Sequence, residues 1–119
     1  MGIFDSLFRG KQSQDFLRGA VLQLQCSGLL PTNYYSAAKK IEATGLQGVM
    51  NMTKEGKIVI EVEGGHSVIE KLVKEIDRML FACACQTELT WVPFANKYHT
   101  FVAHPFVAAE PPAGDKRKL

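Results

Sequence analysis

The chain has 119 residues, of which 46% are hydrophobic and 22% are charged, and its net charge at pH 7 is +2. This length suits one domain with a single core, and so small a charge gives no indication of a nucleic-acid-binding protein. We expect no transmembrane segment, because no apolar run reaches the roughly 18 residues of a membrane-spanning helix, and no signal peptide.

The chain contains three cysteines. An odd number argues against a framework of disulfide bonds and indicates a reducing compartment. We therefore expect a cytoplasmic protein. The sequence also contains no motif for a prosthetic group, so no cofactor is expected.

The chain divides into three parts. Residues 1–18 form an amphipathic segment with a polar linker, and residues 19–106 form the domain itself. Residues 107–119 are rich in proline, glycine and charge, which is typical of a disordered tail.

The first segment has four apolar side chains that would gather on one side of a short helix: Ile3, Phe4, Leu7 and Phe8. A free helix of this length is marginal. We therefore expect that side to pack on the domain, on a second copy of the chain or on a protein partner. Docking on a membrane surface is the alternative.

Within the domain, the pattern of apolar residues alternates between the two-residue period of strands and the 3.6-residue period of helices. Residues 20–26 alternate as a half-buried strand does. After a break at residues 27–31, Thr32 or Asn33 can cap a helix. The apolar face of that helix consists of Tyr34, Ala37, Ala38 and Ile41.

Residues 46–53 and 57–63 are predicted to form a hairpin. Its second strand points three side chains toward the core, Ile58, Ile60 and Val62, and four away from it, Lys57, Val59, Glu61 and Glu63. Ser67-x-x-Glu70 then predicts the capped start of a second helix. That helix buries Ile69, Leu72, Val73, Ile76 and Leu80. Residues 87–92 are predicted to be a fourth strand, and residues 98–103 a short fifth one.

This order is β-α-β-β-α-β with an added edge strand. Right-handed crossovers favour a split β-α-β sandwich for such a chain. The predicted fold is therefore α+β and ferredoxin-like, an antiparallel sheet with both helices on one face.

Over about residues 20–105 the chain resembles the acylphosphatase family. The family pattern Ala-x-x-x-Gly-Leu-x-Gly-Trp-Val-x-Asn, followed by Asp-Gly, is similar to residues 41–52 followed by Glu55-Gly56. Residues 88–93 and 101–103 resemble the family's last long strand and its closing edge strand. The resemblance implies the same fold, and it raises the question of whether this chain hydrolyses acyl phosphates.

In such enzymes the amides of a glycine-rich loop and an arginine hold the phosphate, and an asparagine positions the attacking water. Here the corresponding loop has one glycine and no arginine, Tyr34 stands where the arginine belongs, and Pro31 removes a donor. Met52 stands where the asparagine belongs, and Asn51 precedes it by one residue. A one-residue offset on a strand points to the opposite face. The resemblance therefore implies a domain that has lost the hydrolase.

The main prediction is a non-catalytic acylphosphatase-like domain that binds a ligand or a protein. The alternative is a hydrolase for acyl phosphates or phosphate esters in which Asn51 orients water and the loop amides hold the phosphate. In either case the candidate anion site consists of Ser27, Gly28, Thr32 and Asn33. The plainer explanation of Thr32 and Asn33 is that one of them caps the helix.

The cysteines suggest a third function. Because the first and fourth strands are expected to be antiparallel neighbours, Cys26 should lie near Cys83 and Cys85. Three thiolates can bind a soft metal. Cysteine is also among the residues most often buried, so small core side chains are the favoured explanation.

An RNA-binding sheet of this topology needs stacking aromatics and a basic surface. The open face of the predicted hairpin shows neither, because it consists of Val49, Asn51, Val59, Glu61 and Glu63. We therefore expect no nucleic-acid partner.

Overall fold

The structure, a computed structural model, describes residues 16–107. Its elements are β1 (Leu17–Cys26), α2 (Pro31–Ala43), β2 (Gln47–Met52), β3 (Lys57–Gly65), α3 (His66–Met79), the 3₁₀ turn η1 (Phe81–Cys83), β4 (Cys85–Val92) and β5 (Phe101–Ala103). The predicted tails fall wholly or mostly outside these residues, and so do Ile3, Phe4, Leu7 and Phe8. Within residues 16–107, no helix is long and apolar enough to cross a membrane.

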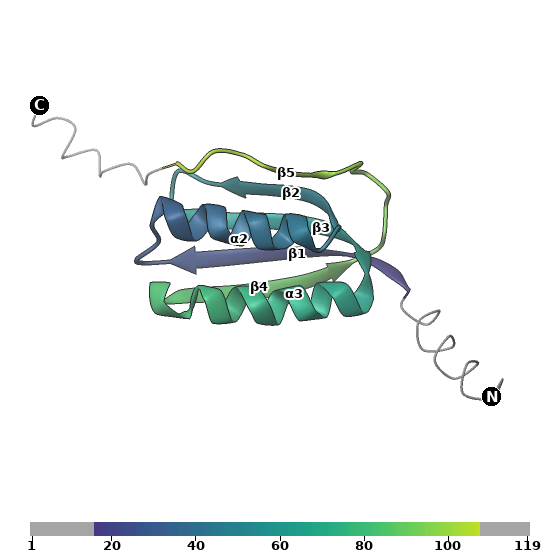
Figure 1. Cartoon of the computed structure of the whole chain (residues 1–119), viewed down its shortest axis with the longest axis horizontal. Helices are drawn as coiled ribbons and strands as arrows, with labels where there is room; N and C mark the ends of the chain where they lie inside the picture. Colours follow the sequence, from purple (N-terminus) through teal and green to yellow (C-terminus); the bar gives the residue numbers. More distant parts are fainter. Residues whose placement is uncertain (1–15, 108–119) are drawn as a thin grey trace, which may run out of the picture.

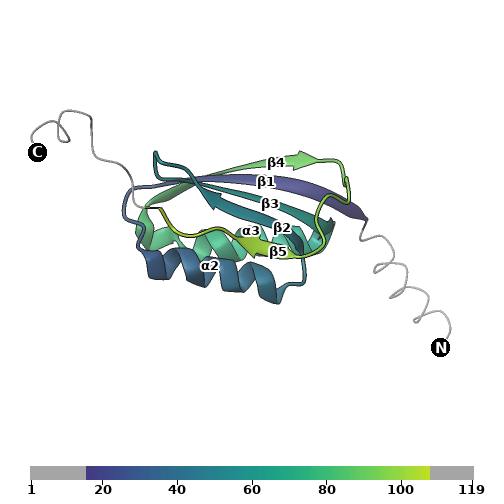
Figure 2. The same cartoon turned by 90° about the horizontal axis from the view of Figure 1, so that it is seen from above.

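The strands form one sheet in the order β4-β1-β3-β2-β5. Both helices cover the same face of this sheet, and among residues 16–107 no helix lies on the other face (Figures 1 and 2). The predicted ferredoxin-like α+β fold is confirmed. The edge strand differs in one respect, because β5 pairs with β2 in parallel. The chain crosses from β4 to the far edge before β5 begins, so β5 runs in the same direction as β2.

The core lies between the sheet and the two helices. Its strand residues are those that the two-residue period predicts, with Leu22, Leu24, Ile58 and Ile60 almost wholly buried. The buried face of α2 is also the predicted one, Tyr34, Ala37, Ala38 and Ile41. On α3 the buried residues are Ile69, Leu72 and Ile76, whereas Val73 is only half-buried.

Both helices begin earlier than predicted. The first begins at Pro31, a position that favours proline because the amide there has no partner within the helix. The second begins at His66 with Gly65 as its N-cap, so Ser67 lies inside the first turn and the predicted capping box is wrong. The reason is that β3 runs directly into α3, where the His66 amide donates to the carbonyl of Phe16 at 2.9 Å.

Glu63 lies on the open face as predicted, yet its side chain is buried with 4% exposed. The connection between β4 and β5 folds over it, and the amides of Ala95 and Lys97 donate to its two carboxylate oxygens at 2.8 and 2.9 Å. Glu61 accepts a 2.6 Å hydrogen bond from the hydroxyl of Tyr98 in the same connection. Part of the open face is therefore covered by the chain itself.

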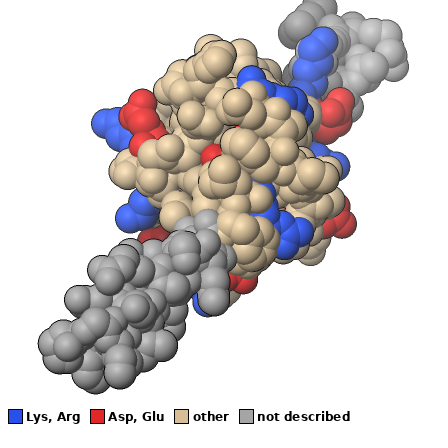
Figure 3. Space-filling view, turned by 90° about the vertical axis from the view of Figure 1, so that its right-hand side faces the viewer, with Lys and Arg blue, Asp and Glu red and all other residues tan. Residues whose placement is uncertain are grey.

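The same connection encloses a hollow of about 350 Å³ on the open face, lined mostly by apolar atoms, including those of Val21 and Val92. Trp91 is not on this face, because its ring stacks on His66 at the start of α3, 4.6 Å away. At that end of the molecule, basic and acidic side chains are scattered and neither sign dominates (Figure 3). The expectation of no nucleic-acid partner remains a prediction.

Candidate functional site

The candidate anion site is the loop between β1 and α2, residues 27–30, with the first turn of α2. Most of the loop is exposed. The loop lies beside the turn that joins α3 to β4, and the Gly28 amide donates to the carbonyl of Cys83 in that turn at 3.2 Å. We call residues 27–30 and 80–84 together the loop end.

Two amides that a phosphate would need are already engaged in this loop, and the residue that follows the loop offers none. Gly28 donates to Cys83, as above, and the Leu30 amide donates to the side-chain oxygen of Asn33 at 3.0 Å. Pro31 has no amide hydrogen. Asn33 therefore acts as half of a capping box from the third helical position, and its own amide donates to the carbonyl of Leu30 at 3.0 Å.

Tyr34, at the position of the family's arginine, is a core residue. Its side chain is fully buried, and its hydroxyl donates to the carbonyl of His104 at 2.7 Å. Burial, and next the charge that Tyr35 would carry when ionised, raise the pKa of Tyr34 to about 12. The residue therefore stays neutral and fastens α2 to the chain after β5, and it offers no cation to a phosphate.

The cations in the described part of the chain are engaged elsewhere or lie outside the loop. Lys40 pairs with Glu75 of α3 at 3.7 Å, and Arg78 pairs with the same carboxylate at 3.7 Å. Arg18 lies over the ring of Trp91, 4.7 Å from its centroid, at the other end of β1. Neither arginine of the described residues, Arg18 or Arg78, therefore takes the place of the one that the family has at Tyr34.

Asn51 is exposed on the open face of the sheet. The pairing of β2 with β3 is regular, with Asn51 opposite Val59 and Met52 opposite Ile58, so no bulge turns Asn51 toward the helices. The loop leads into α2, which covers the other face. Met52, at the family's asparagine position, is half-buried on the helix side. The structure does not bring Asn51 together with the loop.

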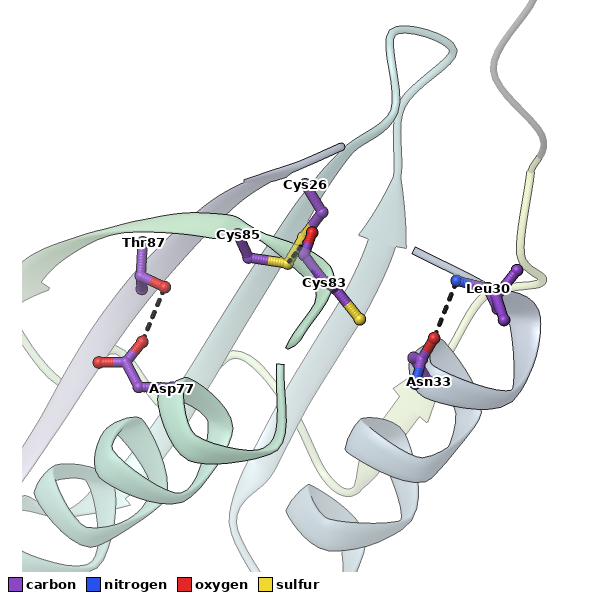
Figure 4. The surroundings of a disulfide bond; sticks show 7 residues. All are labelled: Cys26, Leu30, Asn33, Asp77, Cys83, Cys85 and Thr87. Atoms are coloured by element: carbon purple, nitrogen blue, oxygen red, sulfur yellow. Dashed lines mark hydrogen bonds between the residues drawn. A yellow bond between two sulfur atoms is a disulfide. The ribbon is translucent and has the colours of Figure 1, made fainter. Parts of the chain in front are cut away.

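The three cysteines lie near one another, as the topology predicted, but they are not three thiols. Cys26 and Cys85 face each other across β1 and β4 and form a disulfide bond (Figure 4). This corrects the expectation drawn from an odd cysteine count. Cys83 keeps a free thiol, which is buried and points away from the disulfide.

A Cys-x-Cys pair on an extended segment would have faced one way. Instead Cys83 ends a 3₁₀ turn and Ala84 takes a left-handed conformation, with φ of 52°, before β4 begins at Cys85. The two sulfurs therefore point apart. Among residues 16–107, no three metal-binding side chains are grouped. The thiol site predicted as an alternative is not assembled in this structure.

The loop end carries two exposed apolar side chains that sequence reasoning did not single out. The side chain of Leu30 is 61% exposed, and that of Phe81 is 85% exposed. Phe81 follows α3 but falls outside the helical spacing of its buried residues. That spacing was the sequence signal by which its exposure could have been predicted. Leu30 and Phe81 lie on the two segments of the loop end that the hydrogen bond from Gly28 to Cys83 joins.

No model of a known protein family matches this sequence, and no curated protein matches it. Solved structures do match. The acylphosphatase of Bacillus subtilis aligns with a TM-score of 0.61 at 12% identity, over 75% of this chain and 99% of its own. An acylphosphatase from Coxiella burnetii gives 0.65 at 14% identity, over 76% and 96%.

Full-length HypF, in its phosphate- and nucleotide-bound form, gives a TM-score of 0.62 at 17% identity. The alignment covers 82% of this chain and 13% of HypF, so it concerns one part of that protein. These likenesses confirm the acylphosphatase-like fold that the sequence motifs predicted. At such identities they show the fold alone, and the activity depends on the side chains of the site.

Proposed function

We propose that this acylphosphatase-like domain binds a protein partner through its loop end and does not hydrolyse acyl phosphates. The observation that argues against hydrolysis is that two loop amides already have acceptors within the protein. Gly28 and Leu30 already donate within the protein, to Cys83 and Asn33. Phosphate could use those donors only if both hydrogen bonds broke.

The side chains support the same conclusion. A transferring phosphoryl group needs a cation for its developing charge, and a neutral, buried Tyr34 stands at that position. Asn51, the candidate for orienting water, lies on the face of the sheet opposite α2. The alternative hydrolase, in which Asn51 orients water, therefore lacks a cation for the phosphate and has its asparagine on the wrong face of the sheet.

A protein partner fits the loop end better than a small ligand does. Small-molecule sites are concave and enclose most of their ligand, whereas Leu30 and Phe81 are exposed on the surface. Aromatic side chains are enriched at the centres of protein interfaces. We therefore assign the recognition to these two residues.

The hydrolase is tested with benzoyl phosphate, comparing the wild-type chain, Asn51→Ala and a buffer blank. We expect no turnover above the blank. Titration with inorganic phosphate, followed by NMR of the amides of residues 27–33, should give no saturable shift. Turnover that Asn51→Ala abolishes would overturn the proposal.

The binding surface is tested by comparing the proteins captured by the wild-type chain with those captured by Leu30→Asp/Phe81→Asp. Thr90→Asp, at an exposed position of β4 away from the loop end, is the matched control. A partner should be retained by the control and lost by the double variant. Equal capture by all three would contradict the assignment.

We also propose that Ile3, Phe4, Leu7 and Phe8 pack on the domain or on a second copy. Because Leu17 already belongs to β1, a truncation should remove residues 1–15 and no more. The mass in solution of the shortened chain then distinguishes the two cases. A mass that drops from dimer to monomer supports self-association through this segment, and an unchanged monomer contradicts it.

The disulfide bond bears on the cytoplasmic location that the cysteine count predicts. Disulfides in the cytosol are usually transient or redox-sensing. A cytoplasmic location of this domain therefore requires that the bond between Cys26 and Cys85 be reducible.

A further inference from the structure

We propose that the Cys26–Cys85 disulfide is a reversible clasp on the loop end. The oxidised bond holds residues 27–30 against residues 80–84, and reduction by a dithiol releases them. This inference rests on the proposed function, because it gives the partner-binding surface an ordered form and a loosened form.

The position of the bond carries the argument. Cys26 is the last residue of β1, and Cys85 is the first residue of β4. The residues directly beyond each cysteine form the two segments of the loop end. The bond therefore stands where the two segments leave the sheet, and it sets their separation at the base.

Apart from the disulfide, one hydrogen bond joins the backbones of these two segments among the described residues. It is the 3.2 Å hydrogen bond from the Gly28 amide to the carbonyl of Cys83. A single hydrogen bond contributes a small net stabilisation. Leu29, Leu80 and Cys83 also pack on the core. Without the covalent link, this hydrogen bond and that packing would hold the two segments, from which Leu30 and Phe81 project into solvent.

The sheet beneath does not depend on the clasp. β1 pairs with β4 from Gly19 opposite Val92 down to Cys26 opposite Cys85, and with β3 along almost its whole length. The buried side chains of Leu22 and Leu24 anchor this strand to the core. Reduction should therefore loosen the loop end and leave the domain folded.

The bond is also open to exchange. Cys26 and Cys85 are both half-buried at the end of the sheet, whereas the Cys83 thiol is 5% exposed and points away from them (Figure 4). We therefore infer that an external dithiol approaches the disulfide from the end of the sheet, although both cysteines also pack against the core. Cys83 is not placed to compete for either sulfur.

The exchange proceeds in two displacements. A thiolate of the dithiol attacks one sulfur of the Cys26–Cys85 bond, and the other protein sulfur leaves as a thiolate and takes up a proton. The second thiol of the reagent then displaces the first protein sulfur. Two electrons and two protons pass to the protein, and the reagent ends as a disulfide.

The test is amide hydrogen exchange of the full chain, followed by mass spectrometry before and after treatment with dithiothreitol. Exchange in residues 27–31 and 80–85 should quicken by about tenfold, the factor that corresponds to the net value of roughly one hydrogen bond. β3 and α3 should stay protected over the labelling times in which the loop end exchanges, although the lower global stability of the reduced protein quickens their slowest exchange.

Two variants serve as controls. Cys83→Ser keeps the disulfide and should respond to dithiothreitol as the wild type does. Cys26→Ser/Cys85→Ser should exchange as the reduced wild type does, with or without the reagent. Thiol titration of the denatured, unreduced wild type should find one free thiol, and three after reduction.

Three outcomes would overturn the clasp: three free thiols before reduction, unchanged exchange at the loop end, or loss of protection throughout the domain. The measurement needs no partner. If exchange responds as expected while Leu30→Asp/Phe81→Asp captures the same proteins as the wild type, the clasp stands and the proposed binding surface fails.

Discussion

The hydroxyl of Tyr34 donates a 2.7 Å hydrogen bond to the backbone carbonyl of His104, a residue 70 positions away. This contact fastens the first turn of α2 to the segment that follows β5. An aromatic contact supports this hydrogen bond, because the ring of Phe106 packs edge to face on the ring of Tyr34, with 5.6 Å between the ring centroids. The position that holds the arginine in acylphosphatases is therefore part of the core in this protein.

Replacing Tyr34 with phenylalanine should lower the free energy of unfolding by about 1–3 kcal/mol, because the carbonyl of His104 loses a donor while the ring is kept. Urea unfolding followed by circular dichroism measures the change. Tyr35→Phe is the comparison, because its exposed hydroxyl accepts a 2.9 Å hydrogen bond from the Phe106 amide in the same segment. It should cost less, since water can replace an exposed partner. Equal losses in the two variants would show that the buried His104 contact contributes no more than the exposed one.

The same tyrosine gives a pH dependence. Its folded-state pKa is raised from 10.0 to about 12, so the folded protein holds the proton more tightly than the unfolded chain does. The resulting stability is fully present below pH 10 and is lost as pH rises toward 12. Tyr98, whose pKa is raised to about 12 chiefly by its hydrogen bond to Glu61, acts in the same direction.

We therefore expect the urea concentration at the unfolding midpoint to decrease as pH rises from 10 to 12. The decrease should be less steep in Tyr34→Phe. A slope that is the same in both proteins would assign the dependence to other groups, Tyr98 first among them.

Restoring the asparagine of the family should not restore hydrolysis. Met52→Asn places the side chain at the family's position, on the helix side of β2, yet the amides of Gly28 and Leu30 stay engaged and no arginine is supplied. We expect no turnover of benzoyl phosphate above the blank, in protein shown to be folded by circular dichroism. Turnover by this variant would mean that the loop can rearrange around phosphate.

Loss of the disulfide should lower stability without preventing folding. The bond links residues 59 positions apart, and the chain-entropy model gives about 4 kcal/mol for a loop of that length. Cys26→Ser/Cys85→Ser should therefore unfold at lower urea concentration than the wild type, and Cys83→Ser should stay closer to it. A double variant as stable as the wild type would indicate that the bond is absent in solution.

Glu63 should matter more for stability than Glu61, although both lie on the open face of β3. Its buried carboxylate accepts the amides of Ala95 and Lys97, and hydrogen bonds to charged groups contribute about 1.5–3 kcal/mol each. Glu63→Gln keeps one acceptor and should cost about 1–3 kcal/mol in urea unfolding. Glu61→Gln should cost less, because that carboxylate is partly exposed and screened.

Local periodicity was enough to predict most of the fold. Alternation in residues 20–26 and 57–63 predicted which side chains of β1 and β3 face the core, and the helical spacing predicted the buried face of α2. These patterns work because a strand or helix exposes one face to the core whatever its neighbours are. Gly48, in the motif shared with the family, also has a backbone reason, since a side chain there would overlap the carbonyl oxygen of Glu61.

The sequence by itself therefore determined the order of strands and helices, the core and the absence of the family's arginine and asparagine from their positions. The tertiary structure alone decided the disulfide between Cys26 and Cys85, the burial of Glu63, the direction of β5 and the use of the loop amides. Each of these depends on contacts between segments far apart in the chain. No local pattern carries that information, because the partner of each group is chosen only when the sheet and its connections come together.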